Sequence, residues 1–222
     1  MIRFVLAALL ALLPLAAQAQ TEQQTLVDRS TLSVQEMMNE ENSKDYSGLL
    51  KRARAVMVCP RLFRAGLIVG GEGGGCVLVA RDGGGSWSSP AFFGMGTGSV
   101  GFQIGVSDSQ VIMLIMTDKG LNAVLDSQFK FGADAQVAIA TVGAGVEGAT
   151  TAAVGADIVA VSRSRGLFAG AALEGSLMSA RSEWNRAYYG RDVSPRQIVV
   201  GMEAHNPGAD PLRQVLMQFG TP

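Results

Sequence analysis

The sequence predicts an α+β fold, in which a curled or barrel-like antiparallel β-sheet is flanked by N-terminal and C-terminal helices. Apolar residues with helical spacing occur near both ends of the chain, whereas short runs with strand-like alternation fill its middle. Glycine accounts for 28 of the 222 residues, about 13%, against about 7% in average proteins. A hydrophobic content of 48% supports one substantial core, and a charged content of only 17% argues against disorder.

The first 19 residues have the pattern of a signal peptide. Arg3 precedes an apolar stretch over residues 4–15, and Ala17-Gln18-Ala19 fits the small-x-small cleavage rule. Cleavage there leaves Gln20 first and removes Arg3, so 17 basic and 19 acidic residues remain. The alternative is an uncleaved membrane anchor at the N-terminus. No later stretch of the sequence has the roughly 18 apolar residues that span a bilayer. We expect export across the inner membrane to a periplasm, where the protein is free or peripheral to a membrane.

Residues 20–48 are predicted to form an amphipathic helical segment ahead of the main domain, which spans residues 49–222. Five residues share one face of this segment at helical spacing: Val27, Thr31, Val34, Met37 and Met38. The stretch Ser47–Arg54 indicates a second short helix, with Ser47 as its N-cap.

Strand patterns dominate from Ala55 onward, and helical patterns return near the C-terminus. The strands are expected over Ala55–Cys59, Gly66–Gly71, Gly75–Arg81, Ser86–Phe93, Gly98–Gly105, Gln110–Thr117, Phe129–Phe131, Ala135–Val142, Asp157–Ser162 and Leu167–Gly175. A turn at Asp82–Gly85 and a helix over Lys119–Leu125, capped by Thr117 or Asp118, interrupt them. The last helices are expected over Leu177–Tyr189 and from about Asp210, with Leu212, Val215, Leu216 and Phe219 facing inward.

Two cysteines, Cys59 and Cys76, lie in the part of the chain that remains after the expected cleavage. An even number of cysteines in an oxidising compartment favours a disulfide. This bond would close a loop of about 17 residues and stabilise the fold by about 3 kcal/mol in the chain-entropy model. Two buried free thiols are the alternative.

Two glycine-rich runs have the letters of a nucleotide-binding loop without its context. Gly143–Gly148 reads G-x-G-x-x-G, but only about ten residues separate it from the next expected strand, too few for a dinucleotide-binding unit. Gly70–Gly75 is followed by a strand instead of a helix. Both runs are interpreted as turns, and no cofactor is predicted.

Patterns typical of catalytic and metal sites are missing from the sequence. The nearest approach to G-x-S-x-G, residues 97–101, lacks the first glycine. The single histidine, His205, lies in a loop-like HNPGAD stretch, and no cluster of His, Cys or carboxylate residues has metal-ligand spacing. The sequence therefore predicts a protein that is not an enzyme and holds no metal.

Charge is unevenly distributed along the chain. The stretch from residue 51 to residue 64 has no acidic residue and five basic ones: Lys51, Arg52, Arg54, Arg61 and Arg64. Interleaved with them are apolar residues that would favour an anionic membrane surface if exposed: Leu49, Leu50, Leu62 and Phe63. Residues 108–157 carry six acids and two bases, so a polarised surface is expected. The alternative for the basic stretch is a solvated rim on a normally packed helix.

Several motifs in the same order resemble the SYLF domain family, a lipid-binding and actin-binding domain first described in yeast actin-patch proteins. The most informative is SRSRGLFAGAALEG, Ser162–Gly175, where the signature residues are Arg163, Arg165, Gly166, Gly170, Glu174 and Gly175. The other matching stretches are Gly66–Arg81, Gly85–Gly105, Phe129–Gly143 and Tyr188–Gly190. By this resemblance the chain is identified as a secreted bacterial member of the family.

The resemblance implies a non-enzymatic, lipid-binding function, with Lys51, Arg52 and Arg54 as candidate headgroup contacts. Arg61 and Arg64 are added as candidates by the charge pattern of the same stretch. It also implies that Glu174 forms a buried structural pair with Arg163 or Arg165. Because an exported chain should meet neither actin nor phosphoinositides, the expected partner is anionic lipid of the cell envelope, and nucleic acid is not expected. The alternatives are a protein-interaction or structural module of the periplasm, which self-assembles through edge strands, and a carrier of a small amphiphile.

Overall fold

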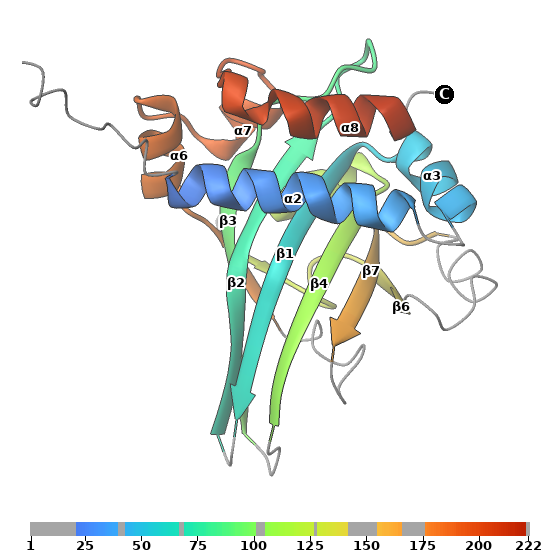
Figure 1. Ribbon diagram of the computed structural model, residues 1–222, viewed down its shortest axis with the longest axis vertical. Helices are drawn as coiled ribbons and strands as arrows, with labels where there is room; N and C mark the ends of the chain where they lie inside the picture. The colour runs from blue at the N-terminus through green and yellow to red at the C-terminus, as the bar shows by residue number, and fades with distance from the viewer. Residues whose placement is uncertain are drawn as a thin grey trace, which may run out of the picture.

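The computed structural model describes residues 21–39, 43–66, 69–100, 105–126, 128–141, 155–165 and 176–220. These residues form an eight-stranded sheet that curls into a half-barrel, with helices before and after it in the chain (Figure 1). The expected α+β class, with a curled sheet and flanking helices, is confirmed. The strand order across the sheet is β5-β8-β3-β2-β1-β4-β7-β6.

The described elements have the following bounds. The strands are β1 (Ala55–Gly66), β2 (Val69–Ala80), β3 (Ala91–Val100), β4 (Gly105–Ile115), β5 (Gln128–Lys130), β6 (Val137–Thr141), β7 (Ile158–Arg165) and β8 (Leu177–Ala180). The helices are α2 (Glu22–Met38), α3 (Ser43–Arg52), α4 (Asp118–Leu125), α6 (Ser182–Tyr189), α7 (Pro195–Val199) and α8 (Asp210–Gly220), with a short 3₁₀ helix η2 (Pro207–Ala209). Among them, no helix is long and apolar enough to cross a membrane.

The sheet is mixed, which corrects the expectation of a purely antiparallel one. All neighbouring strands are antiparallel except β6 and β7, which run parallel from the pair Val137 and Ile158 to the pair Thr141 and Ser162. A parallel pair needs a crossover of about a dozen residues or more. Residues 142–157 supply that length between the two strands.

The glycines at 70–75 lie within a strand, so their interpretation as a turn is wrong. Strand β2 runs through all of them and pairs with β1 on one side and β3 on the other, and these two ladders override the low strand propensity of glycine. Gly74 is required there because a Cβ would lie 2.1 Å from the carbonyl oxygen of Arg61. That carbonyl approaches because β1 has an irregular register, or bulge, between Cys59 and Leu62.

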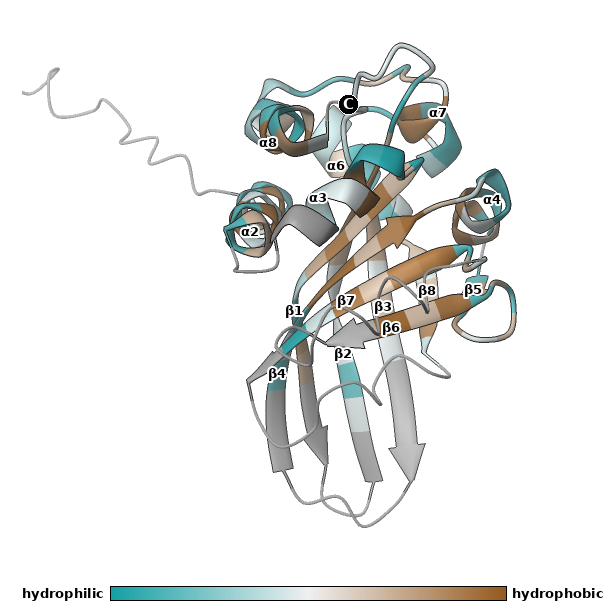
Figure 2. Cartoon of the chain, turned by 90° about the vertical axis from the view of Figure 1, so that its right-hand side faces the viewer, coloured by the Kyte–Doolittle hydropathy of each residue, from teal (hydrophilic) through white to brown (hydrophobic). Residues whose placement is uncertain are grey.

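Each face of the sheet packs into a separate hydrophobic core. One core joins the sheet to α2, α3, α6 and α8, and includes Val56, Val77 and Phe92. The other unites residues from opposite ends of the sheet, such as Phe129 of β5 and Ile158 of β7, because it fills the inside of the curl together with α4 and α7. Figure 2 shows the apolar strands between these helices.

The predicted N-terminal and C-terminal helices are confirmed. Helix α2 buries the five residues that share its apolar face, and α8 buries Leu212, Val215 and Leu216. Thr117 caps α4 by accepting a hydrogen bond from the amide of Gly120. Helix α3 begins at Ser43, earlier than expected, so Ser47 lies inside it and is not its N-cap. The Ser47 hydroxyl instead donates to the carbonyl of Phe219, 3.2 Å away.

Residues 177–180 form a strand, whereas a helix was expected over Leu177–Tyr189. Strand β8 pairs with β3 on one side and with β5 on the other, so the tertiary context decides its conformation. The helix begins only at Ser182. The turn at Asp82–Gly85 is confirmed: the Asp82 amide donates to the carbonyl of Ser86, and Gly85 has a positive φ of 90°.

Candidate binding site

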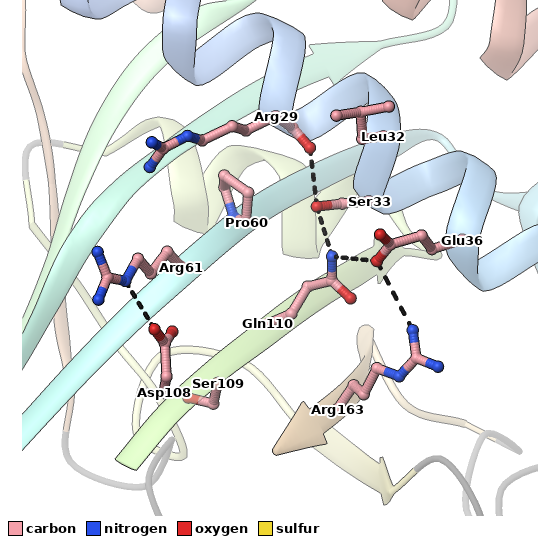
Figure 3. A pocket seen from close by; sticks show the side chains of 10 residues that line it. All are labelled: Arg29, Leu32, Ser33, Glu36, Pro60, Arg61, Asp108, Ser109, Gln110 and Arg163. Atoms are coloured by element: carbon pink, nitrogen blue, oxygen red, sulfur yellow. Dashed lines mark hydrogen bonds and ion pairs between the residues drawn. The ribbon is translucent and has the colours of Figure 1, made fainter. Parts of the chain in front are cut away.

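Helix α2 crosses the outer face of the sheet at β1, and two adjoining clefts open along this crossing. The smaller has a volume of about 270 Å³ and the larger of about 650 Å³. Both are lined by Arg29 of α2 and by Pro60 and Arg61 of β1, which lie in the bulge. Figure 3 shows the smaller cleft, with Arg29 extending from the helix over Pro60.

The helix wall of the smaller cleft follows from sequence spacing. Arg29, Leu32, Ser33 and Glu36 are spaced at i, i+3, i+4 and i+7, so they form one stripe of α2. This stripe lies beside the apolar face that packs on the sheet. The strand wall comes from Arg61 of β1 and its neighbours on β4 and β7.

A chain of polar contacts closes one side of the smaller cleft. Gln110 of β4 donates from Nε2 to Ser33 Oγ at 2.6 Å and to Glu36 Oε2 at 3.3 Å. Arg163 of β7 lies opposite Gln110 in the sheet, and its Nη1 is 3.6 Å from the same Glu36 oxygen. These contacts fasten the C-terminal half of α2 to the strands.

Exposed cations and apolar side chains lie where the smaller cleft adjoins the larger one. Arg61 donates from Nε to Asp108 Oδ2 at 2.7 Å and lies over the ring of Phe63, 5.6 Å from its centroid. Arg29 is exposed and makes no ion pair with another described residue. Leu32 is 57% exposed and Phe63 is 43% exposed. We call Arg29, Leu32, Arg61 and Phe63 the α2 edge.

The structure divides the five basic residues that were expected to form one docking surface. Lys51 and Arg52 are exposed at the end of α3, and Arg54 lies 3.6 Å from Asp118 beside the start of β1. Arg61 lies six residues after Ala55, the start of β1. At 3.3 Å per residue this is about 20 Å along the strand. The side chain of Arg64 is outside the described residues.

The apolar residues of the basic stretch are mostly not exposed. Leu49, Leu50 and Leu62 are at most 2% exposed, so Phe63 is the one exposed residue among the four apolar residues of this stretch. The amphipathic α3 and the inner face of β1 pack these three leucines into the two cores. The expectation of exposed apolar neighbours is therefore wrong for the leucines and right for Phe63.

The basic and acidic stretches do not form two separate surfaces. Strand β1 pairs with β4, and this pairing places Asp108 beside Arg61 and Asp118 beside Arg54. Asp157 is buried, where it accepts hydrogen bonds from Thr117 Oγ1 at 2.7 Å and from Lys119 Nζ at 2.9 Å. The Lys119 contact, followed by that of Thr117, lowers the pKa of Asp157. The expected separation of basic and acidic surfaces is therefore wrong at Arg54 and Arg61, which lie beside acids of the other stretch.

Only part of the family signature lies within the described residues. Arg163 contacts Glu36, and Arg165 stands opposite Asp108 in the β4–β7 ladder, with its side chain undescribed. Gly166, Gly170, Glu174 and Gly175 lie outside the described residues, as do the expected signal peptide at 1–19 and the glycine run at 143–148. The pairing expected for Glu174 therefore stays a prediction.

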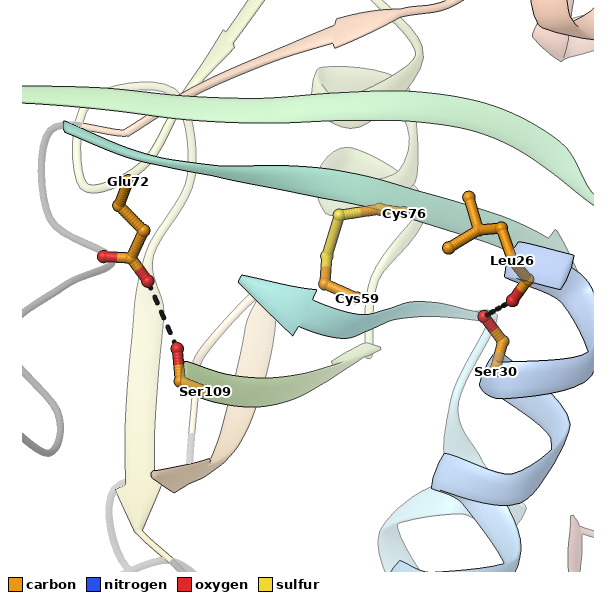
Figure 4. Close-up of a disulfide and its surroundings, with 6 residues drawn as sticks. All are labelled: Leu26, Ser30, Cys59, Glu72, Cys76 and Ser109. Carbon is orange, nitrogen blue, oxygen red and sulfur yellow. Dashed lines mark hydrogen bonds between the residues drawn. A yellow bond between two sulfur atoms is a disulfide. The ribbon is translucent and has the colours of Figure 1, made fainter. Parts of the chain in front are cut away.

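Cys59 and Cys76 form a disulfide that joins β1 to β2, as predicted (Figure 4). Cys59 directly precedes Pro60 and Arg61 of both clefts, and Cys76 directly follows the glycines at 73–75 that line the larger one. The bond consequently fixes the distance between two walls of the larger cleft.

Within the described ranges, no group of three His, Cys, Asp or Glu residues could hold a metal ion. His205 is exposed, and its Nε2 lies 3.0 Å from Asp210 Oδ1. The α2 edge offers cations, hydrogen-bond donors and apolar surface. This combination suits binding of an anionic partner.

Arg29 and Leu32 do not stand out in the sequence as site residues. The available signal was the polar stripe beside the apolar face of α2, but an exposed helical arginine has no special meaning until the opposite wall is known. Arg163 was singled out for a different partner.

Comparison with known proteins identifies the family. Residues 96–219 match the family Ysc84, described as "Las17-binding protein actin regulator". Protein YSC84 of Saccharomyces cerevisiae is 30% identical over 171 residues, which cover 76% of this chain and 36% of the relative. Human SH3 domain-containing YSC84-like protein 1 is 31% identical over 159 residues, 71% of this chain and 46% of the relative. The chain thus spans less than half the length of these relatives. It belongs to the Ysc84, or SYLF, family of binding and regulatory domains.

Proposed function

We propose that this chain is a non-enzymatic module that binds anionic lipid at a membrane surface of the cell envelope. The observation that carries the proposal is the α2 edge, where two exposed arginines and two exposed apolar side chains surround adjoining clefts. An anionic membrane attracts such a surface in two ways, because cations approach the phosphates while apolar side chains enter the headgroup layer.

The ion pair of Arg61 is compatible with this role. Its side chain is 55% exposed and that of Asp108 is 44% exposed. Exposed pairs of this kind contribute only about 0 to 1 kcal/mol. A lipid phosphate can therefore replace Asp108 as the partner of Arg61 at small cost, while Arg29 has no partner to give up among the described residues.

The location and the partner class belong to the same proposal. The signal pattern of residues 1–19 supports export to a periplasm. The family description refers to actin regulation and Las17 binding, and an exported chain would not meet such cytoskeletal partners. We therefore assign lipid to this chain and leave the cytoskeletal partners with the relatives.

Co-sedimentation of the protein with vesicles tests the proposal. We expect binding to phosphatidylglycerol vesicles that exceeds binding to phosphatidylcholine vesicles and falls as salt shortens the Debye length from about 30 Å at 0.01 M to about 8 Å at 0.15 M. Arg29→Gln should weaken binding about fivefold, because each cation near the headgroups contributes about 1 kcal/mol.

Lys130→Gln is the matched control, since Lys130 is an exposed cation on β5 at the far edge of the sheet. It should bind anionic vesicles like the unmodified protein. Equal binding to neutral and anionic vesicles, or equal losses in the two variants, would contradict a lipid surface at the α2 edge.

A further inference from the structure

The larger cleft of the α2 edge has a cationic end and an apolar wall. Its apolar lining comes from Leu26 of α2, Phe63 of β1 and Trp184 of α6, and its cations are Arg29 and Arg61. A volume of about 650 Å³ lies within the range of sites that hold one small molecule, roughly 300 to 1,000 Å³. The cleft is therefore large enough for a molecule, and not only for contact with a flat surface.

The larger cleft has residues of opposite charge at two different positions along α2. Arg29 lies at the end shared with the smaller cleft, and Glu22 also lines the larger cleft. Glu22 and Arg29 are seven positions apart on α2, about 10 Å at 1.5 Å per residue. An anionic group is attracted at Arg29 and repelled at Glu22, so an elongated ligand would place its charge at the arginine end.

The floor of the larger cleft is bare backbone. Gly73, Gly74 and Gly75 of β2 line it without side chains. Leu26 of α2 covers Gly75, where a Cβ would lie 2.9 Å from the leucine side chain, so the uncovered part of the floor is at Gly73 and Gly74. A glycine floor lets a ligand lie directly against a strand. The wall above it includes Phe63, which is 43% exposed.

We infer that the larger cleft holds the aliphatic chain of a single anionic amphiphile of phospholipid type, with its charged head at Arg29 and Arg61. This inference rests on the proposed function and adds that one lipid molecule is bound in a defined site. The cations select an anionic head, and the apolar wall with its bare floor selects an aliphatic chain.

Fluorescence titration with dihexanoyl phosphatidylglycerol, below its critical micelle concentration, tests the inference. The chain has two tryptophans: Trp87 is fully buried, whereas Trp184 lines the cleft, so Trp184 reports on occupancy. We expect saturation at one lipid per protein and a blue shift of the emission. Dihexanoyl phosphatidylcholine should bind at least fivefold more weakly, and inorganic phosphate should not shift the emission.

Two variants locate the head and the chain. Phe63→Ser should weaken binding of the short-chain phosphatidylglycerol at least fivefold, whereas Arg29→Gln should remove most of the preference for phosphatidylglycerol over phosphatidylcholine. Leu177→Ser is the matched control, because Leu177 is an apolar strand residue, 50% exposed, that does not line this cleft. It should bind like the unmodified protein, and circular dichroism should show all three variants folded.

Three outcomes would overturn the inference alone, and a fourth would overturn the proposed function with it. The first is the absence of saturable binding of the short-chain lipid while anionic vesicles are still bound, which leaves the proposed function intact. The second is equal affinity of Phe63→Ser and Leu177→Ser. The third is a dimer in sedimentation velocity that Phe63→Ser dissociates, because the cleft is then an interface between two copies. Loss of both vesicle and short-chain binding would reject the proposed function as well.

Discussion

Arginines at two places along the sheet have opposite roles. At the start of β1, the Arg81 guanidinium donates to the carbonyls of Leu50, Lys51 and Gly220, at 2.8 to 3.1 Å. It also lies 4.6 Å from the ring centroid of Trp87, and burial lowers its pKa. At the α2 edge, Arg29 projects beside a cleft and makes no ion pair with another described residue. We call the first region, with Arg54, Arg81, Thr117 and Asp157, the closed end.

The difference shows that an arginine beside a helix end is bound by the carbonyls of that end, whereas an arginine in the middle of a helix stays available. The last carbonyls of a helix lack partners within the helix and carry a partial negative charge. Arg81 satisfies the ends of both α3 and α8 at once. Arg29 lies in the middle of α2, where the backbone groups are already paired, so its charge remains available to a ligand.

The largest effect is expected from the disulfide, which is covalent support for the walls of the larger cleft. The double variant Cys59→Ala/Cys76→Ala should lose about 3 kcal/mol of unfolding free energy, because the loop constraint is removed from the unfolded state. Urea denaturation measures this loss, and adding reductant to the unmodified protein should reproduce it. Reductant without effect on the urea midpoint would show that the two sulfurs are not bonded in solution.

Arg81→Met should cost about 2 kcal/mol of unfolding free energy. Three charge-assisted hydrogen bonds to carbonyls are lost, and water recovers part of that energy because one of the three is exposed. Vesicle binding by the folded variant should be unchanged, in contrast to Arg29→Gln, which should change binding and leave stability as it was. If Arg81→Met weakens vesicle binding as strongly as Arg29→Gln, the distinction between the closed end and the α2 edge fails.

Asp157→Asn should cost about 1.5 kcal/mol at neutral pH, since the carboxylate accepts from Thr117, Lys119 and the amide of Gln136. The pKa of Asp157 is lower in the folded protein than its unfolded value of about 3.9. Its contribution is therefore complete well above pH 4 and is lost as the pH falls through the lowered pKa. Urea midpoints measured between pH 7 and pH 2 should converge for the two proteins at the acidic end. Parallel curves would contradict a charged Asp157 in the closed end.

Local patterns predicted more of the molecule than long-range ones. The apolar face of α2, the cap of α4 at Thr117 or Asp118 and the turn at Asp82–Gly85 depend on neighbouring residues. The structure has all three, with Thr117 as the cap. The strand β2 depends on its pairing with the two neighbouring strands β1 and β3, and the strand at Leu177 depends on partners far away in the chain. Both were misjudged, because the glycines of β2 were interpreted as a turn and Leu177 as part of a helix.

The candidate site was predictable only in part for the same reason. Arg61 and Phe63 belong to the basic stretch of the sequence, but their opposite wall, with Arg29 and Leu32, comes from a helix that precedes the sheet. No local pattern in α2 indicates which strand it crosses. The burial of Leu49, Leu50 and Leu62 likewise depends on the packing of α3 and β1.

The smallest change in unfolding free energy is expected at Gly94 of β3, and the change has the opposite sign at Gly74 of β2. Gly94→Ala should raise the unfolding free energy by about 0.5 kcal/mol, because a Cβ there makes ordinary contact with Arg181 at 3.6 Å and the unfolded chain loses freedom. Gly74→Ala should destabilise instead, because its Cβ would lie 2.1 Å from the Arg61 carbonyl and force the bulge in β1 to move. Since this bulge carries Pro60 and Arg61 into both clefts, Gly74→Ala should also weaken vesicle binding, whereas Gly94→Ala should not. Urea denaturation and vesicle co-sedimentation of the two variants check these expectations. Equal stability and equal vesicle binding of Gly74→Ala and Gly94→Ala would contradict a role of the β1 bulge in binding at the α2 edge.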